Sequence, residues 1–144
     1  MNCWARADRL PAVAETTWEI LRAVELDAKA DLPATFLGHG LQRHLEIAIA
    51  LACAPKLLLL DEPTAGMSPE ETERTIALVK RIAAGRTVIV VEHKMKVVMS
   101  ISDRITVLHQ GAVLAEGSPE EIRAHDRVQE VYLGRRPRAH AAPA

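Results

Sequence analysis

The sequence contains little cysteine, no excess of charge of either sign and no long apolar run, and each shortage excludes a class of protein. Two cysteines, Cys3 and Cys53, occur in 144 residues. Without a Cys-x-x-Cys pair or a Cys/His cluster, this usage is typical of a reduced, cytoplasmic protein that lacks a structural zinc. The formal net charge of −1 argues against general affinity for nucleic acid. The apolar runs are far shorter than a membrane span, and the first six residues hold no apolar segment of a secretory signal. What remains is a chain long enough for one domain.

The run Leu57–Leu60 stands out because it shows no alternation of apolar and polar residues. This pattern is typical of a strand that is buried on both faces, as in a parallel sheet covered by helices. Asp61 and Glu62 follow directly, and Pro63 ends the run. Open α/β sheets bind ligands at the carboxyl ends of their strands. We therefore expect both carboxylates at the functional rim of the sheet, although acids at this position can also simply solvate a strand end.

A second buried strand is predicted at Thr87–Val91, which is rich in β-branched residues and brings Glu92 and His93 to the same rim. Between the strands, Ser68 begins a helix as its N-cap, with proline at the first position and acids in the first turn. Glu71, three residues after Ser68, completes a capping box. This helix is expected to run to Ala84, with Gly85 after its end. Strand, helix and strand in this order predict a right-handed βαβ unit.

The remaining chain reads as short helices and one hairpin. Helical spacing is expected from Glu15 to Pro33, after 14 residues with little pattern, and again from Leu41 to Cys53. In the latter helix the residues expected to face inward are Leu45, Ala48, Ile49 and Ala52. Further predicted elements are a helix at 94–102, a hairpin of 104–108 with 112–115, a second Ser-Pro-Glu-Glu helix start at Ser118, and a short helix pair ending at Leu133. The tail 134–144 is predicted to be disordered.

Several motifs in this order and spacing resemble the ATP-binding subunits of ABC transporters, above all those of branched-chain amino-acid and urea importers. They are Gly38-His39-Gly40, Leu57–Glu62, Ala65–Ser68 and His93. The resemblance runs from about Trp18 to Gly134. It implies that Gly38, His39 and Gly40 form the signature, which lies against the γ-phosphate of an ATP held mainly by a second ATP-binding subunit. Independently, a helix start has free N–H groups and a dipole that favour an anion. Ser68 is implied to belong to the D-loop, which crosses the dimer interface.

The resemblance also implies the roles of the residues at the rim. Asp61 would hold Mg²⁺ through water, Glu62 would orient and polarise the attacking water, and His93 would contact the γ-phosphate. ATP and Mg²⁺ are thus the implied cofactors. The residues alone leave a second interpretation open, because Asp61, Glu62, Glu92 and His93 are all metal-ligand types, although their spacing fixes no particular metal.

The sequence departs from the family where phosphate is bound. No glycine in the chain is followed by lysine, so the P-loop, whose backbone N–H groups and lysine bind the β- and γ-phosphates, is absent from it. The family's A-loop aromatic residue and Q-loop glutamine are absent as well. Gly38 replaces the signature serine, and Leu41 replaces a polar residue. The loss of one charge-assisted hydrogen bond to phosphate costs on the order of 1.5–3 kcal/mol.

The predicted fold class is therefore α/β: a partial P-loop NTPase (ABC ATPase) domain with parallel strands, flanking helices, a C-terminal β-hairpin and short helices. Residues 1–36 are assigned to the end of a helical subdomain (1–14 poorly patterned), 37–134 to the C-terminal part of the ATPase domain and 135–144 to the tail. Because the central strand lacks its neighbours, its edge and faces are expected to be exposed.

The leading hypothesis is an incomplete ATP-binding subunit of an importer, cut short or begun internally, which neither binds nor hydrolyses ATP alone. Its partners would be a second ATP-binding subunit and transmembrane permease subunits, which would place it on the inner face of the plasma membrane. The alternative is a non-catalytic interaction module that docks on a transporter or on a separately encoded N-terminal half. An ABC ATPase of the DNA-repair or translation type is disfavoured, because the chain has no coiled-coil insertion and its sequence at Gly66–Pro69 resembles that of the importers.

Overall fold

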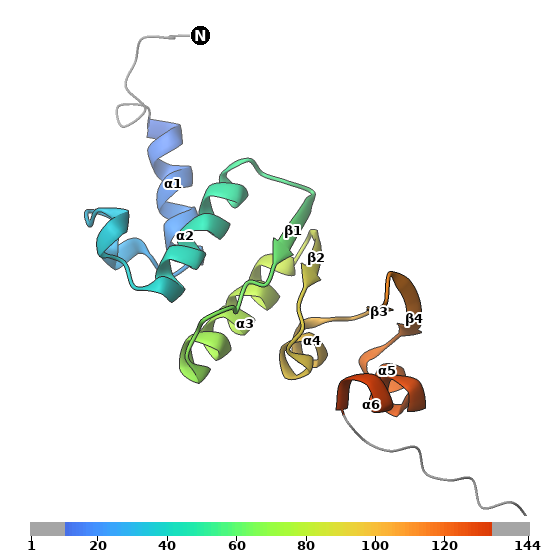
Figure 1. Cartoon of the computed structure of the whole chain (residues 1–144). Helices are drawn as coiled ribbons and strands as arrows, with labels where there is room; N and C mark the ends of the chain where they lie inside the picture. Colours follow the sequence, from blue (N-terminus) through green and yellow to red (C-terminus); the bar gives the residue numbers. More distant parts are fainter. Residues whose placement is uncertain (1–10, 134–144) are drawn as a thin grey trace, which may run out of the picture. The chain divides into compact units, whose positions relative to one another are not determined.

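The structure is a computed structural model that describes residues 11–133. The stretch before Pro11 and the predicted disordered tail therefore lie outside the described residues. In chain order the elements are α1 (Pro11–Ala23), the 3₁₀ turns η2 (Asp27–Lys29) and η3 (Ala34–Phe36), α2 (His39–Ala52), β1 (Leu57–Asp61), α3 (Pro69–Ala83), β2 (Thr87–Val91), α4 (Met95–Ile101), β3 (Ile105–His109), β4 (Ala112–Gly117), α5 (Pro119–Ala124) and α6 (Asp126–Leu133) (Figure 1). The chain divides into two compact units between His93 and Lys94. No helix among the described residues is long and apolar enough to cross a membrane.

The first unit is built around the parallel pair β1 and β2, whose register runs from Leu57 opposite Thr87 to Asp61 opposite Val91. Both predicted strands are confirmed in position, and α3 connects them as expected. The second unit adds an antiparallel pair, β3 with β4. The described chain is thus mixed α/β, which confirms the predicted class.

Only one face of the β1–β2 pair is covered. Leu58 and Leu60 are 5% and 9% exposed, whereas Leu57 and Leu59 on the other face are 48% and 67% exposed. The same exposed face continues onto β2, where the side chains of Ile89 and Val91 are 49% and 60% exposed. The prediction of a strand buried on both faces is therefore wrong for the described chain. The expectation that its faces are exposed in the absence of neighbouring strands holds for one face only. We name Leu57, Leu59, Ile89 and Val91 the outer sheet face.

Two helices differ from their predictions for identifiable reasons. α1 begins at Pro11, within the stretch that we expected to be poorly patterned, because proline suits the first helical position. In α2 the interior stripe is rotated by one position from the predicted one. The expectation that Ile49 and Ala52 face inward is wrong, since both are exposed. The buried stripe of α2 is Gly40, His44, Ile47, Ala48 and Leu51.

The start and end of α3 confirm the sequence prediction. The Ser68 side chain accepts a hydrogen bond from the Glu71 N–H, and the Glu71 carboxylate accepts one from the Ser68 N–H, which completes the capping box. Gly85 follows the helix with φ of +80°, the left-handed conformation that glycine adopts without steric cost. The inward face of α3 consists of Thr75, Leu78, Val79 and Ile82.

The second unit has its own small core. β3 and β4 are joined through Gln110 and Gly111, both at positive φ, as in the two-residue turns that match the twist of a hairpin. Ser118 caps α5 with the same capping box as in α3. The buried cluster of this unit is Ile105, Val107, Ala115, Ile122 and Val128, with Met95, Val98, Met99 and Leu114 packed against it.

Candidate functional site

The carboxyl ends of β1 and β2 meet at one rim, as the sequence predicted. Glu62 follows β1 directly, and its backbone N–H donates to the Val91 carbonyl at the end of β2, over 2.9 Å. Glu62 has φ of +43°, an uncommon conformation for a residue with a side chain, and one that concentrates at functional sites. This residue turns the chain out of the sheet, and the turn closes with a 3.0 Å hydrogen bond from the Ala65 N–H to the Glu62 carbonyl.

The rim brings Glu62 and His93 into contact. The His93 Nδ1 lies 3.1 Å from the Glu62 Oε1. Both side chains are accessible, His93 at 63% and Glu62 at 48% of their full exposure. A carboxylate beside an imidazole can accept a proton from water or orient an imidazole N–H, and both groups here are open to an incoming ligand. Asp61, the last residue of β1, is also exposed.

Glu92 directly follows β2 and differs from its neighbours because its side chain is fully buried, at 0% exposure. Its Oε1 accepts hydrogen bonds from the Thr64 hydroxyl and from the Thr64 N–H, the latter at 3.3 Å. Its Oε2 accepts from the His93 N–H at 3.1 Å. The sequence placed Glu92 at this rim but gave no sign that it would be buried there, because a Glu after a strand is ordinarily solvated.

The predicted signature opens α2 and lies against the loop that follows β1. α2 begins at His39, with Gly38 as an N-cap residue that makes no side-chain cap. A Cβ placed on Gly66, which has φ of +70°, would lie 3.3 Å from the His39 Cε1, and a Cβ placed on Gly40 would lie 2.8 Å from the Glu71 Oε1. The signature and the predicted D-loop are thus in direct contact within one chain, and glycine at both positions permits their close approach.

Ser68, predicted for the D-loop, has a visible local function as the N-cap of α3. Its hydroxyl also donates to the Glu70 carboxylate over 2.9 Å. The backbone N–H of Glu70 and then the Ser68 hydroxyl hold the pKa of this carboxyl below its ordinary value. These bonds fix the start of α3 beside the predicted signature. A role of Ser68 across a dimer interface remains a prediction.

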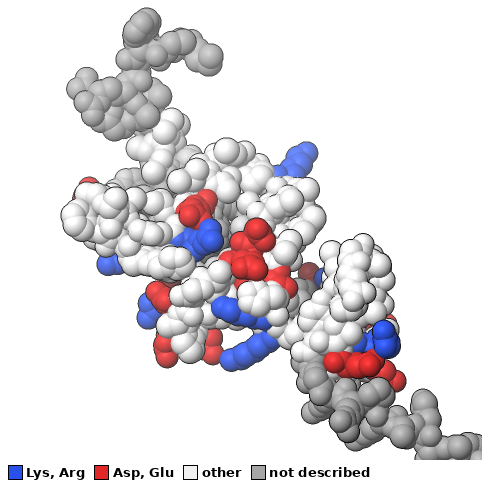
Figure 2. Space-filling model, viewed as in Figure 1, with Lys and Arg blue, Asp and Glu red and all other residues white. Residues whose placement is uncertain are grey.

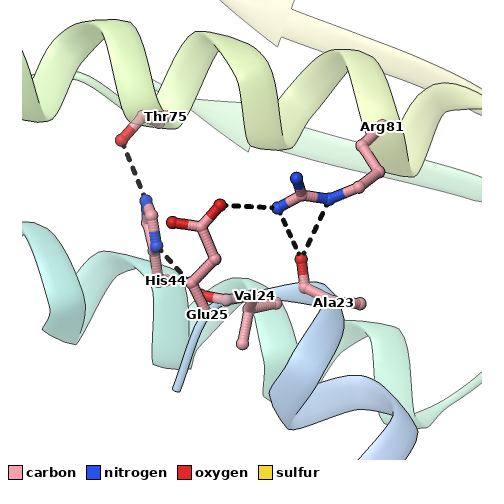
Figure 3. Close-up of polar contacts among 6 residues, drawn as sticks. All are labelled: Ala23, Val24, Glu25, His44, Thr75 and Arg81. Atoms are coloured by element: carbon pink, nitrogen blue, oxygen red, sulfur yellow. Dashed lines mark hydrogen bonds and ion pairs between the residues drawn. The ribbon is translucent and has the colours of Figure 1, made fainter. Parts of the chain in front are cut away.

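A polar clamp ties α2 and α3 to the end of α1 (Figure 3). The buried His44 contacts the Val24 carbonyl through Nδ1 and the Thr75 hydroxyl through Nε2, each at 3.1 Å. Because a carbonyl only accepts hydrogen bonds, Nδ1 carries a proton. Arg81 of α3 donates to the Ala23 carbonyl at 2.8 and 3.2 Å and to the Glu25 carboxylate at 3.1 Å.

The clamp gives His44 a structural role that the sequence did not reveal, since a lone histidine in a helix carries no signal of its partners. Glu25, at φ of +63°, turns the chain immediately after α1. Arg81 bonds on both sides of Val24, so these contacts join α1, α2 and α3 in one packed group. The predicted signature at the start of α2 is therefore mounted on a helix fixed by buried hydrogen bonds.

A shallow cleft of about 230 Å³ lies between α2 and β1. Its polar lining comes from Arg43 and Glu46, which form a 2.6 Å ion pair on α2, and from Asp61. Leu59 of the outer sheet face contributes apolar surface. Among the described residues 11–133, no three His, Cys, Asp or Glu side chains gather as they would around a directly ligated metal.

The charged residues show no large field of one sign on the visible face of the described residues. Figure 2 shows Lys and Arg interspersed with Asp and Glu over that face. That nucleic acid is not the partner remains a prediction from the net charge of −1.

Comparisons with known proteins agree with this geometry. Family models match residues 4–65, described as "ABC transporter", and residues 112–137, described as "Branched-chain amino acid ATP-binding cassette transporter". The high-affinity branched-chain amino acid transport ATP-binding protein BraF of Pseudomonas aeruginosa is 47% identical over 79% of this chain and 46% of its own length. LivG of Escherichia coli, also a high-affinity branched-chain amino acid transport ATP-binding protein, is 43% identical over 82% of this chain and 46% of its own length.

The chain belongs to the ATP-binding domains of ABC transporters. A solved ATP-binding cassette of an ABC transporter, MJ1267 in its ADP conformation, superposes with a TM-score of 0.75 at 29% identity, covering 84% of this chain and 50% of that one. The chain spans about half the length of the curated relatives it matches. The ABC ATPase fold predicted from the sequence is thereby confirmed, and so is the predicted resemblance to branched-chain amino acid transport ATP-binding proteins.

Proposed function

We propose that this chain supplies four parts of the ATP-binding subunit of a branched-chain amino-acid importer: the signature, the Walker B carboxylates Asp61 and Glu62, the D-loop and the switch histidine His93. The observation that carries the proposal is the contact of Glu62 with His93 at the shared rim, in a chain 43–47% identical to BraF and LivG. The names of these relatives refer to branched-chain amino acids, so the proposal favours these solutes over urea.

Each rim residue has a distinct chemical task in this proposal. Asp61, exposed at the end of β1, holds Mg²⁺ through water. Glu62 accepts a hydrogen bond from the attacking water and polarises it, and His93 donates toward the γ-phosphate. When bound, ATP with Mg²⁺ supplies the transferable phosphoryl group and the neutralisation of its charge. Gly38, His39 and Gly40 offer the backbone N–H groups of the α2 start to the nucleotide of a second subunit.

The residues fit such a nucleotide in part. The rim offers carboxylates and an imidazole, and there is open space around Gly38, where an added Cβ meets no atom within 4 Å. A P-loop is lacking, since no glycine in the sequence precedes a lysine. Micromolar affinity requires about −8 kcal/mol, which one water-mediated carboxylate and one exposed histidine do not supply. We expect calorimetry with ATP and Mg²⁺ to show no saturable binding to this polypeptide in that range, and a clear isotherm there would contradict the proposal.

The outer sheet face supports the proposal that a further polypeptide completes the site. It is an apolar surface on the two strands that deliver Glu62 and His93, and the shallow cleft beside Leu59 opens next to it. Burial of such a face is the main driving force for the association of protein segments. In this proposal a polypeptide that carries the family's P-loop covers the face and provides the missing phosphate contacts.

Reconstitution tests the proposal. The chain is mixed with a separate polypeptide that carries the family's P-loop segment, and ATP binding and phosphate release are measured. The pair should bind and hydrolyse ATP. Glu62→Gln should reduce turnover to a small residual rate while ATP binding persists, because the amide is not a base. Gly38→Ser should strengthen the γ-phosphate contact by returning a hydroxyl. Hydrolysis by the Glu62→Gln pair at the parental rate would disprove the assigned role of Glu62.

A second candidate is a non-catalytic module that docks on a transporter or on a separately encoded half, and the exposed outer sheet face favours it. It predicts association without phosphate release in the same reconstitution, which distinguishes it from the first. In either case the partners are a second ATP-binding subunit and permease subunits, and the chain is held at the inner face of the plasma membrane through the permease.

A further inference from the structure

The ion pair of Glu62 and His93 is too weak to fix the distance between the two side chains by itself. Both side chains are about half exposed or more, at 48% and 63%, and exposed ion pairs of this kind contribute little because solvent screens them and long side chains lose freedom on pairing. The relative placement of the two residues must therefore come from their backbones. A single side chain, that of Glu92, makes hydrogen bonds to both of these backbone segments.

The bonding group is the carboxylate of Glu92. One oxygen accepts from the Thr64 N–H at 3.3 Å and from the Thr64 hydroxyl, and the other accepts from the His93 N–H at 3.1 Å. Thr64, at 1% exposure, lies two residues after Glu62 in the turn that Glu62 begins. A single side chain thus bonds the turn that carries Glu62 on one side and the residue that carries the imidazole on the other.

Burial makes this link strong. The Glu92 side chain has 0% exposure, and a hydrogen bond away from water is electrostatically stronger than one in water. A buried carboxylate is tolerated only when donors compensate its lost hydration. Glu92 therefore cannot turn toward solvent without leaving the donors of Thr64 and His93 unsatisfied.

We propose that Glu92 is a positioning residue, which fixes the distance between Glu62 and His93 by bonding the Thr64 turn and the His93 backbone at once. Thr64 is its partner in this device. The inference deepens the proposed function and rests on it for its catalytic meaning, but the link itself is a property of the chain. Removal of the link leaves both reacting groups present and lets them drift apart, and misplacement of this kind costs on the order of 10- to 100-fold in rate.

The first experiment needs no catalysis. Amide hydrogen exchange is measured in the 144-residue chain for the N–H groups of Thr64 and His93. Glu92→Gln should increase their exchange at least severalfold, while the ladder amides of β1 and β2 keep their protection. Glu19→Gln, on the exposed surface of α1, is the matched control and should change neither set. Unchanged exchange at Thr64 and His93 in Glu92→Gln overturns the proposal.

The second experiment uses the reconstituted pair and a double-mutant cycle. Glu92→Gln should lower kcat about 10- to 100-fold and change KM for ATP little. In the Glu62→Gln background it should lower the residual rate no further, because it acts through Glu62. A purely structural Glu92 would lower kcat equally in both backgrounds, and that outcome also overturns the proposal. If the parental pair does not hydrolyse ATP, the proposed function fails while hydrogen exchange still decides the positioning role.

Thr64 provides the rescue series and protects the test against a Glu92 variant that does not fold. Thr64→Val keeps the volume but removes the hydroxyl donor, and should reproduce the faster exchange and the kcat loss in part. Thr64→Ser keeps the donor, and should restore both readouts to near the parental values. Equal behaviour of the valine and serine variants would show that the hydroxyl bond to Glu92 has no positioning effect.

Discussion

The two strand pairs of the molecule differ in the polarity of the residues on their outer faces. The hairpin β3–β4 presents Thr106 opposite Glu116, and Arg104 donates to the same carboxylate over 3.2 Å. Only near its turn does it expose apolar side chains, Leu108 and Val113. The parallel pair β1–β2 exposes four large apolar side chains, those of the outer sheet face, and on that face polar residues stand only at its two ends, at Thr87 and Asp61.

This difference indicates which unit is complete in itself. Away from its turn the hairpin has a polar outer face, and its inner face is packed on its own helices, which is the usual alternation of a two-layer structure. The parallel pair has the composition of a strand covered on both sides but has helices on only one. The unit with the candidate chemistry is thus the one that leaves an apolar sheet face uncovered.

The largest effect is expected on β1, where neighbouring leucines point to opposite faces. Leu58→Ala should lower the free energy of unfolding by about 2–5 kcal/mol, because it removes a buried side chain and leaves a cavity. Leu59→Ala should cost about 0.5 kcal/mol or less, because that side chain is 67% exposed. Denaturant unfolding measures both. Equal losses would show that the outer sheet face is covered in the isolated chain, and a dependence on protein concentration would identify self-association as the cover.

The same leucines show how far the sequence could go. The continuous apolar run predicted the strand, its parallel partner and the rim correctly, because buried parallel strands share this composition. The run alone could not predict the 67% exposure of Leu59, because a strand with apolar residues on both faces has the same composition whether or not the elements that would cover both faces are present. The alternating burial depends on which neighbouring elements the described chain contains.

At the site, the sequence predicted which residues lie at the rim but not the hydrogen bonds that connect them. The strand ends placed Glu62 and His93 together, as the 3.1 Å contact confirms. The buried state of Glu92 depends on Thr64, 28 residues away in sequence, and the phase of α2 depends on the hydrogen bonds of His44 to Val24 and Thr75. Long-range polar pairs of this kind leave no periodic pattern to detect.

A smaller effect is expected at the two helix starts, which share the sequence Ser-Pro-Glu-Glu and occur one in each unit. Ser68→Ala and Ser118→Ala each remove a hydroxyl that accepts the N3 backbone N–H, at 3.2 Å in α3 and 3.3 Å in α5. Each should lower the free energy of unfolding by about 1 kcal/mol. The matched Ser→Asp variants keep a side-chain acceptor and should retain most of the stability. A much larger loss for one serine than for the other would reveal a contact beyond the shared capping box.

The smallest effect concerns charge on the polar face of the hairpin. Hydrogen bonds from Arg104 and then from Thr106 hold the pKa of Glu116 below its ordinary value of 4.5. Because the folded-state pKa lies below the unfolded one, this interaction stabilises the fold above about pH 4.5 and is lost as the pH falls through the folded pKa. Arg104→Met should raise the Glu116 pKa, and Thr106→Val should raise it less, since the arginine is the larger cause. Carboxyl chemical shifts followed through an acid titration measure both, with Arg127→Met, which breaks a separate exposed pair with Glu130, as the control. A Glu116 titration unchanged by Arg104→Met would mean that the outer face of the hairpin is polar without being organised, and would weaken its contrast with the outer sheet face.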